Sequence, residues 1–104
     1  MLYNNLKLLI FVLNYPDQKL VDFINQKVNK LNLFFGNIVD SEVFLKIITP
    51  NSNNNKLVEI KINVPGKELF AKKKSKSFEE AIVDAVDALR IQITKHKEKL
   101  YTKS

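Results

Sequence analysis

The sequence predicts an α+β fold in the order β-α-β-β-β-α, a four-stranded mixed sheet with two helices packed on one face. Two segments carry apolar residues at the three- and four-residue spacing of an amphipathic helix. Four shorter segments are continuously apolar or alternate with period two, as strands do. At 104 residues, 45% of them hydrophobic, the chain has the size of one domain. We therefore expect a single domain over 1–104, with an ordered core at about 6–100.

The first two elements are separated by a short turn signal. Residues 6–13 form an apolar run typical of a buried strand, and the sequence Asn14-Tyr15-Pro16-Asp17 follows it. Asp17 is the expected N-cap of a helix, and Gly36 with Asn37 is expected to end it. The apolar face of this helix is predicted to consist of Leu20, Ile24, Val28, Leu31 and Phe35.

Three strands are expected to follow as an antiparallel meander. Residues 38–49 form the first of them and residues 50–55 a polar loop. Residues 57–64 alternate between apolar and polar side chains, which indicates a strand with one solvent-facing side. After the turn Pro65-Gly66-Lys67, residues 68–73 return as the last strand. The strand at 6–13 is expected to pair in parallel, because a helix connects it to the next strand.

The last helix has the clearest N-terminal signal. Ser77 and Glu80 have the spacing of a capping box, with Ser77 as the N-cap. An apolar stripe follows from Phe78 to Leu100, with acidic residues in the first half and basic residues in the second. This order of charges matches the helix dipole.

The charge of the chain favours a polyanionic partner. The net charge is +6, of which residues 1–52 supply +1 and residues 53–104 supply +5. Arg90 is the one arginine among seventeen basic residues. Lysine acts as a point charge suited to phosphate, so we expect recognition of a nucleic-acid backbone with little base reading. A lysine-rich solvated surface, or a compositional bias of the genome, is the alternative.

Three basic groups are expected to converge beside the seam between the helices. The first is Lys27 with Lys30 in the first helix, the second is the group of lysines at 72–76 at the end of the last strand, and the third lies in the last helix. In the last helix, Lys95 and Lys99 share one flank with Gln92, and Arg90 and Lys97 lie on the other; both flanks are expected to border the seam. The helix dipole alone would explain part of this clustering. The predicted RNA-binding residues are Lys27, Lys30, Lys72, Lys73, Lys74, Lys76, Arg90, Gln92, Lys95, Lys97 and Lys99.

Several kinds of function are disfavoured. The chain has no cysteine, one histidine and two glycines, so thiolate metal sites, paired imidazoles and glycine-rich phosphate loops are excluded. His96 is expected to be half-buried or capping, and Asp40 with Glu42 to be a solvated edge. We therefore predict no enzyme activity, no metal, no cofactor and no small-molecule substrate. The apolar run at 6–13 is too short to cross a bilayer, so a cytoplasmic protein without a membrane partner is expected.

Several segments together resemble the ribosome hibernation promoting factor and ribosome-associated inhibitor family, also called the sigma-54 modulation protein family. The similarity covers roughly residues 6–100 and rests on the order and spacing of the segments. They are Lys27-Val28-Asn29-Lys30-Leu31, residues 57–66 (LVEIKINVPG), Phe78-Glu79-Glu80-Ala81-Ile82, Val86-Asp87-Ala88-Leu89, Gln92 and Lys95-His96-Lys97.

The resemblance implies a fold related to double-stranded-RNA-binding domains and a function in ribosome hibernation. Such a protein binds the small ribosomal subunit through 16S rRNA near the decoding site and the tRNA channel. It silences translation under stress or in stationary phase by excluding tRNA and mRNA, and off the ribosome it is expected to be a monomer. The positions matched to the family's RNA contacts are Lys27, Lys30, Gln92, Lys95 and Lys97.

The sequence also departs from the family pattern. Leu33, Ile91 and Thr94 stand where members often carry a base, which leaves the strength of RNA binding open. No extension follows Ser104, so a short-form member is expected. The alternative hypothesis is a protein-interaction module that uses an exposed sheet face containing Phe44 and Ile48.

Overall fold

The computed structural model describes residues 7–12, 18–36, 38–48 and 53–102, although not the side chains of 7–12 and 100–102. The elements follow the predicted order and lie within a few residues of the predicted bounds. They are β1 (Lys7–Val12), α1 (Gln18–Phe35), β2 (Asp40–Ile47), β3 (Lys56–Val64), β4 (Lys67–Ser75) and α2 (Phe78–Thr102).

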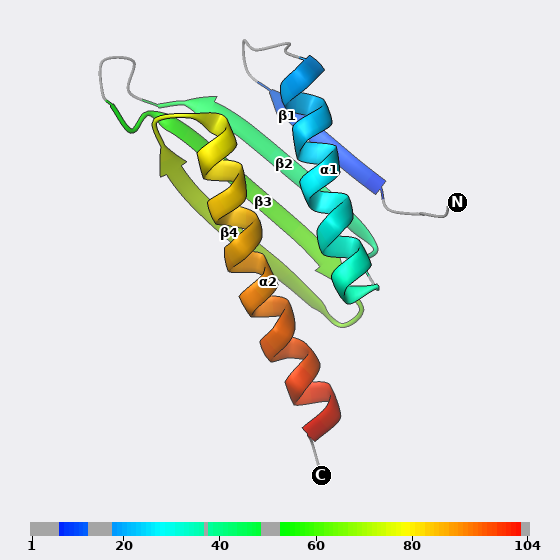
Figure 1. Ribbon diagram of the computed structural model, residues 1–104. Coiled ribbons are helices and arrows are strands. Elements are labelled where there is room, and N and C mark those ends of the chain that lie inside the picture. The colour runs from blue at the N-terminus through cyan, green and yellow to red at the C-terminus, as the bar shows by residue number, and fades with distance from the viewer. Residues whose placement is uncertain (1–6, 13–17, 37, 49–52, 103–104) are drawn as a thin grey trace.

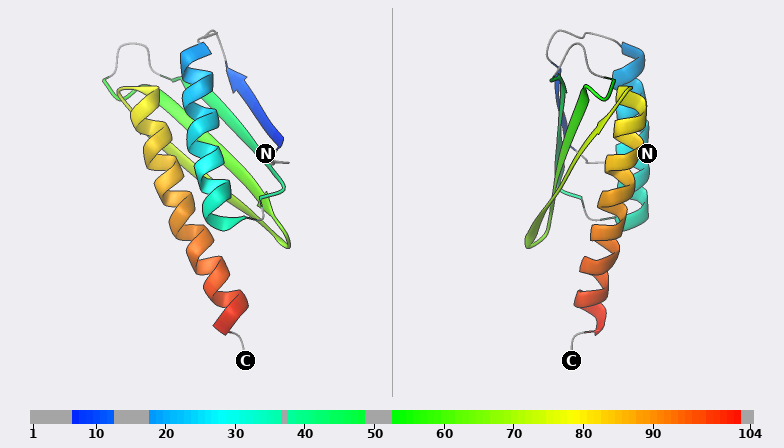
Figure 2. Two further views of the ribbon diagram at one scale, coloured as in Figure 1. Left: turned by 45° about the vertical axis from the view of Figure 1, so that its right-hand side comes forward. Right: turned by 90° about the vertical axis from the view of Figure 1, so that its left-hand side faces the viewer.

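The strands form one sheet in the order β1-β2-β3-β4, with β1 parallel to β2 and the other neighbours antiparallel. Val43 of β2 lies opposite Ile60 of β3, and Ile60 lies opposite Ala71 of β4. Both helices cover the same face of this sheet, as Figures 1 and 2 show. The predicted α+β arrangement, with two helices on an antiparallel meander, is therefore confirmed.

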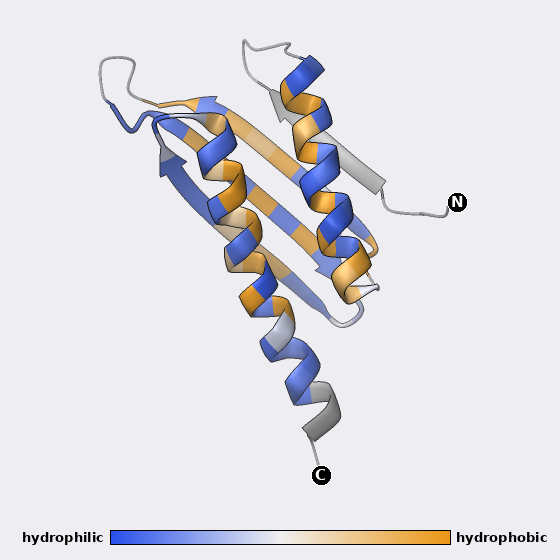
Figure 3. Cartoon of the chain, viewed as in Figure 1, coloured by the Kyte–Doolittle hydropathy of each residue, from blue (hydrophilic) through white to orange (hydrophobic). Residues whose placement is uncertain are grey.

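The core lies between the sheet and the two helices. The alternation of β3 turns Val58, Ile60, Ile62 and Val64 toward the helices, where each is at most 4% exposed. Figure 3 shows this alternation along the strand and an apolar stripe on each helix. The helices contribute Leu20, Ile24, Val28 and Leu31 from α1 and Phe78, Ile82, Ala85, Leu89 and Ile93 from α2.

The start of α2 uses half of the predicted capping box. The Ser77 hydroxyl accepts a hydrogen bond from the backbone N–H of Glu80 at 3.1 Å, as an N-cap does. The Glu80 carboxylate accepts a hydrogen bond at 2.6 Å from the hydroxyl of Ser75, a buried residue at the end of β4. The cap therefore joins α2 to the strand that precedes it.

Two glycines occupy positions that favour glycine. Gly36, with φ of 87°, follows α1 and donates its N–H to the Asn32 carbonyl, a helix-ending arrangement. Gly66, with φ of 79°, stands after Pro65 in the turn between β3 and β4. The predicted N-cap Asp17 and the helix-stop residue Asn37 lie outside the described residues.

The two helices run in the same direction over the sheet, and α2 continues past its edge (Figures 1 and 2). Ile93 is the last residue of α2 in the buried core. Neither helix in the described part of the chain is both long and apolar enough to span a membrane.

Candidate nucleic-acid interface

A solvent-open groove of about 280 Å³ lies along the seam between α1 and α2. Each helix contributes residues spaced by three or four positions, which places them on one flank of that helix. Buried aliphatic side chains form the floor of the groove, and charged side chains form its walls. The lining residues are Lys27, Lys30, Leu31 and Phe34 of α1 and Val83, Val86, Asp87 and Arg90 of α2.

Phe34 forms an aromatic wall of the groove between basic side chains. The Arg90 guanidinium carbon lies 5.9 Å and the Lys97 ammonium nitrogen 5.1 Å from the centroid of its ring. Lys97 also lies 5.8 Å from the ring of Phe35. These distances are within the range of cation–π attraction, so α1 rings help to hold α2 cations beside the groove.

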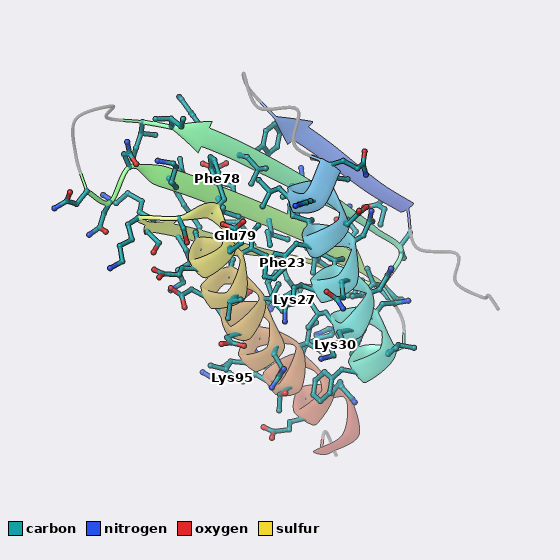
Figure 4. All side chains as sticks on the ribbon, turned by 45° about the horizontal axis from the view of Figure 1, so that its top comes forward. Phe23, Lys27, Lys30, Phe78, Glu79 and Lys95 are labelled. Carbon is teal, nitrogen blue, oxygen red and sulfur yellow. The ribbon has the colours of Figure 1, made fainter. Side chains whose placement is uncertain are left out.

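Lys27 and Lys30 supply positive charge from the α1 side. Figure 4 shows both side chains between the helices. The Lys27 ammonium lies 5.4 Å from the centroid of the Phe23 ring, one helical turn earlier. Together with Arg90 and Lys97 they form the groove cations, a name we use for these four residues. The carboxylate of Asp87 also lines the groove.

The other flank of α2 does not border the seam, so this part of the sequence prediction was wrong. The Gln92 side-chain amide donates a hydrogen bond at 2.8 Å to the backbone carbonyl of Phe70 on β4. Gln92 therefore fastens α2 to the edge of the sheet. Lys95 points away from α1, as Figure 4 shows, and Lys99 is exposed in the part of α2 beyond the core.

The strand lysines form a separate group, contrary to the expectation of convergence. Lys72, Lys73 and Lys74 lie at the end of β4, and Lys76 follows before α2 begins; all are exposed. Because α2 starts at this end of the sheet and runs away from it, these lysines lie at the opposite end from the C-terminal turns of α2 (Figure 1). Lys72 pairs with Glu59 across the strands at 3.8 Å.

The sheet face turned away from the helices carries paired charges and two exposed rings. Lys61 lies 3.3 Å from Glu68 and 3.5 Å from Glu42. The hydrogen bond to Glu68 and the negative charge of Glu42 raise the pKa of Lys61 above the ordinary 10.5. Phe44 is 43% exposed and Phe70 47% exposed on this face.

Ile48, expected to be exposed with Phe44, is half-buried, and its backbone N–H donates to the Asn55 carbonyl at 3.0 Å. The exposed aromatic partner on this face is Phe70, on β4.

His96 is half-buried, as predicted, and its ring centroid lies 6.3 Å from that of Phe35. No hydrogen-bond partner for its Nε2 is found among the residues that the structure describes. Over the same ranges, no group of three histidine, aspartate or glutamate side chains is placed to hold a metal ion.

Phe34, Val83 and Asp87 line the groove but were not among the residues predicted from the sequence. A signal for Phe34 was present, because it follows Lys27 by seven positions and Lys30 by four and so shares their flank. Leu33 and Ile91, which replace expected bases, are 83% and 59% exposed. Apolar side chains therefore stand on the solvent side of both helices.

Comparisons with known proteins agree with this arrangement of helices and sheet. The model of the family "Sigma 54 modulation protein / S30EA ribosomal protein" matches residues 15–101. A ribosome hibernation promoting factor from Klebsiella oxytoca is 32% identical over 79 residues, which are 76% of this chain and 79% of that protein.

Two solved structures share the fold. A ribosomal subunit interface protein from Coxiella burnetii superposes with a TM-score of 0.78 at 17% identity. The N-terminal domain of Protein Y from Thermus thermophilus superposes with a TM-score of 0.73 at 21% identity. Each comparison covers 89% of this chain and 99% of the other. Because the family model matches residues 15–101, which are most of the chain, the chain belongs to the Sigma 54 modulation protein / S30EA ribosomal protein family.

Proposed function

We propose that this protein is a ribosome hibernation factor. It binds the small ribosomal subunit through 16S rRNA near the decoding site and the tRNA channel, and it silences translation by blocking tRNA and mRNA. The observation that carries the proposal is the convergence of the groove cations between two helices of a family member. The relatives named for hibernation and for the ribosomal subunit interface support the choice of partner.

The groove cations are the proposed primary contacts with ribosomal RNA. The three lysines among them neutralise phosphates as point charges without reading the base sequence, which suits a fixed position on a folded RNA. We propose Lys95 and Lys99 as outer contacts on α2, and Lys72, Lys73, Lys74 and Lys76 as contacts with a second stretch of backbone. Gln92 acts through its bond to β4, by fixing the position of α2.

On this proposal, the protein inhibits translation by occupying the path of tRNA and mRNA, and it catalyses no reaction. A protein that fills the tRNA and mRNA path needs no cofactor, no metal and no small-molecule substrate. We propose that the chain acts as a cytoplasmic single domain over 1–104 and is a monomer off the ribosome. A relation of its fold to double-stranded-RNA-binding domains stays a prediction.

Sedimentation with purified small subunits tests the proposal. The wild-type protein should co-sediment at low salt and dissociate as the salt concentration rises, because counterions compete for the phosphates. The variant Lys27→Glu/Arg90→Glu should remain in the supernatant. The control variant Lys46→Glu/Lys67→Glu makes the same change in net charge on two exposed strand lysines outside the proposed RNA contacts and should still co-sediment. Equal loss in both variants, or no wild-type binding, would refute the proposal.

A competition experiment tests the proposed position on the ribosome. Increasing tRNA, bound to small subunits with mRNA, should displace the wild-type protein in proportion to tRNA occupancy. Simultaneous binding of both at saturation would show that the protein sits elsewhere.

The exposed rings on the far side of the sheet favour one alternative, a protein-interaction module. Phe44→Ser/Phe70→Ser would then abolish association with the partner chain, whereas charge reversal at Lys95 and Lys97 would spare it. For the ribosome proposal the expected result is the reverse: the serine variant still co-sediments with small subunits.

A further inference from the structure

We propose that the groove between α1 and α2 binds one unpaired nucleotide of RNA, with its base stacked on the ring of Phe34. Lys27, Lys30 and Arg90 would hold the adjoining phosphates. The inference rests on the proposed function in one respect, since the RNA in question is ribosomal. It adds a recognition mode that charge alone does not supply.

The ring of Phe34 is available to a ligand. Its neighbour Phe35 packs against the core, whereas Phe34 is 46% exposed although two cations lie over it. A large aromatic ring on the solvent-exposed flank of a helix contributes little to the stability of the fold. A phenylalanine placed among basic side chains is the arrangement by which proteins bind single-stranded nucleic acid, because every base has a face that stacks.

The shape of the groove fits one ring system. Leu31 and Val86, which are 2% and 6% exposed, give an apolar floor, and Val83 at 36% lies beside them. The volume of about 280 Å³ is near the lower end for small-ligand pockets, roughly 300–1,000 Å³. This is room for a base and its sugar.

The charges around the groove distinguish a nucleotide from other anions. Three cations line the groove and Lys97 lies beside them, which favours phosphate. Asp87 is a hydrogen-bond acceptor among them, and its negative charge repels any anionic group placed against it, so a ligand there must offer a donor. In a nucleotide the same acceptor finds donors, because a ribose has a 2′-hydroxyl and most bases have an exocyclic amino group.

In the free protein, the side chains of Arg90 and Lys97 lie over the ring of Phe34. Arg90 is exposed and Lys97 half-buried, so both long side chains can swing from the ring to a phosphate when a base arrives. The cation–π contacts at 5.9 and 5.1 Å then serve as a resting position that keeps the cations at the groove.

A tryptophan reporter tests the stacking. The chain has no tryptophan, so Phe34→Trp introduces a single indole in the groove. Phe44→Trp is the matched control, because Phe44 is exposed to a similar extent, 43% against 46%, on the opposite side of the sheet. Each variant is titrated with a short oligoadenylate, with a blunt RNA duplex and with inorganic polyphosphate, and binding is followed separately by sedimentation.

Oligoadenylate should quench the fluorescence of Phe34→Trp and leave that of Phe44→Trp unchanged. Polyphosphate and the duplex should bind through charge without quenching. Binding of oligoadenylate without quenching, or equal quenching by polyphosphate, would overturn the stacking proposal while leaving RNA binding intact. A chain that binds neither oligoadenylate nor small subunits would overturn both proposals.

Affinity measurements give a second test that does not use a reporter. Phe34→Ala should weaken binding to oligoadenylate about tenfold and binding to the duplex hardly at all. Phe34→Leu keeps apolar bulk without an aromatic face and should lose as much as the alanine variant. Because Phe34 lies outside the buried core, both variants should keep the wild-type circular dichroism spectrum. Full affinity in the leucine variant would show that the ring is not a stacking platform.

Discussion

Phe34 and Phe35 are adjacent residues with different surroundings. One residue turns an α-helix by about 100°, since 3.6 residues make a turn. Phe35 therefore packs against the core and stands near His96, while Phe34 stands in the groove with Arg90 and Lys97. Together the two rings lie near the side chains of both Lys97 and His96, so the end of α1 positions this part of α2.

Lys61 gives a prediction about titration. Its pKa should lie above 10.5 in the wild type because of Glu68 first and Glu42 second. Glu68→Gln should lower that pKa more than Glu42→Gln does, as followed by NMR of the lysine side chain. The paired charge stabilises the fold below pH 10.5 and is lost as the pH rises through the elevated pKa. Identical titration of all three proteins would contradict the proposed cause.

Gly66 gives a prediction about stability. Its φ of 79° strains any residue with a Cβ, although a Cβ added there would meet no atom within 4 Å. Gly66→Ala should lower the free energy of unfolding by about 1 kcal/mol through backbone conformation alone. Gly66→Asn should lose less, because asparagine tolerates this region. Urea denaturation measures both, and an alanine variant as stable as the wild type would disprove the argument.

At the scale of elements, the N-terminus of α2 depends on one hydroxyl. Ser77→Ala removes the acceptor for the Glu80 N–H and should lower the free energy of unfolding by about 1 kcal/mol. Ser77→Thr keeps an oxygen at the same position and should recover most of the loss. Thermal and urea unfolding of the three proteins test this, and a fully stable alanine variant would show that water replaces the cap.

The elements were largely predictable because their signals are local. The alternation in β3 and the stripe of Leu20, Ile24, Val28 and Leu31 each follow from which side chains must be buried. The flanks of α2 were not predictable in the same way. A stripe shows which side of a helix faces the core, but which flank lies beside α1 and which beside β4 depends on the order of the packed elements. Gln92 was therefore assigned to the wrong neighbour.

At the scale of the molecule, the predicted RNA-binding cations lie in three places: the groove, the outer flank and end of α2, and the end of β4. The four groove cations are all among the residues that were expected to lie beside the seam between the helices. The expectation that the strand lysines converge with the groove cations was wrong, because α2 begins where β4 ends and runs away from that end of the sheet. The spacing of Phe34 from Lys27 and Lys30 places it on their flank, but its contact with Arg90 depends on how the two helices pack and could not be predicted.

The salt dependence of small-subunit binding should report how many groove cations meet phosphates. Each neutralised phosphate contributes about 0.7 to 0.9 to the slope of log K against log salt concentration. Lys97→Gln should reduce the slope by about 1, whereas Lys46→Gln, on an exposed position of β2, should leave it unchanged. Binding assays over a range of potassium chloride measure the slopes. Equal slopes for wild type and Lys97→Gln would mean that Lys97 meets no phosphate.

The extension of α2 past the sheet has a consequence for amide hydrogen exchange. From Lys95 to Lys99 no side chain belongs to the buried core. Since Lys97 and His96 contact the end of α1 through Phe34 and Phe35, this stretch can open without disturbing the sheet. Its amides should exchange faster than those near Leu89 in the free protein and slow down on the small subunit. Part of the binding free energy would then be spent on ordering the last turns of the helix. Residues that stiffen this overhang should tighten binding without touching RNA.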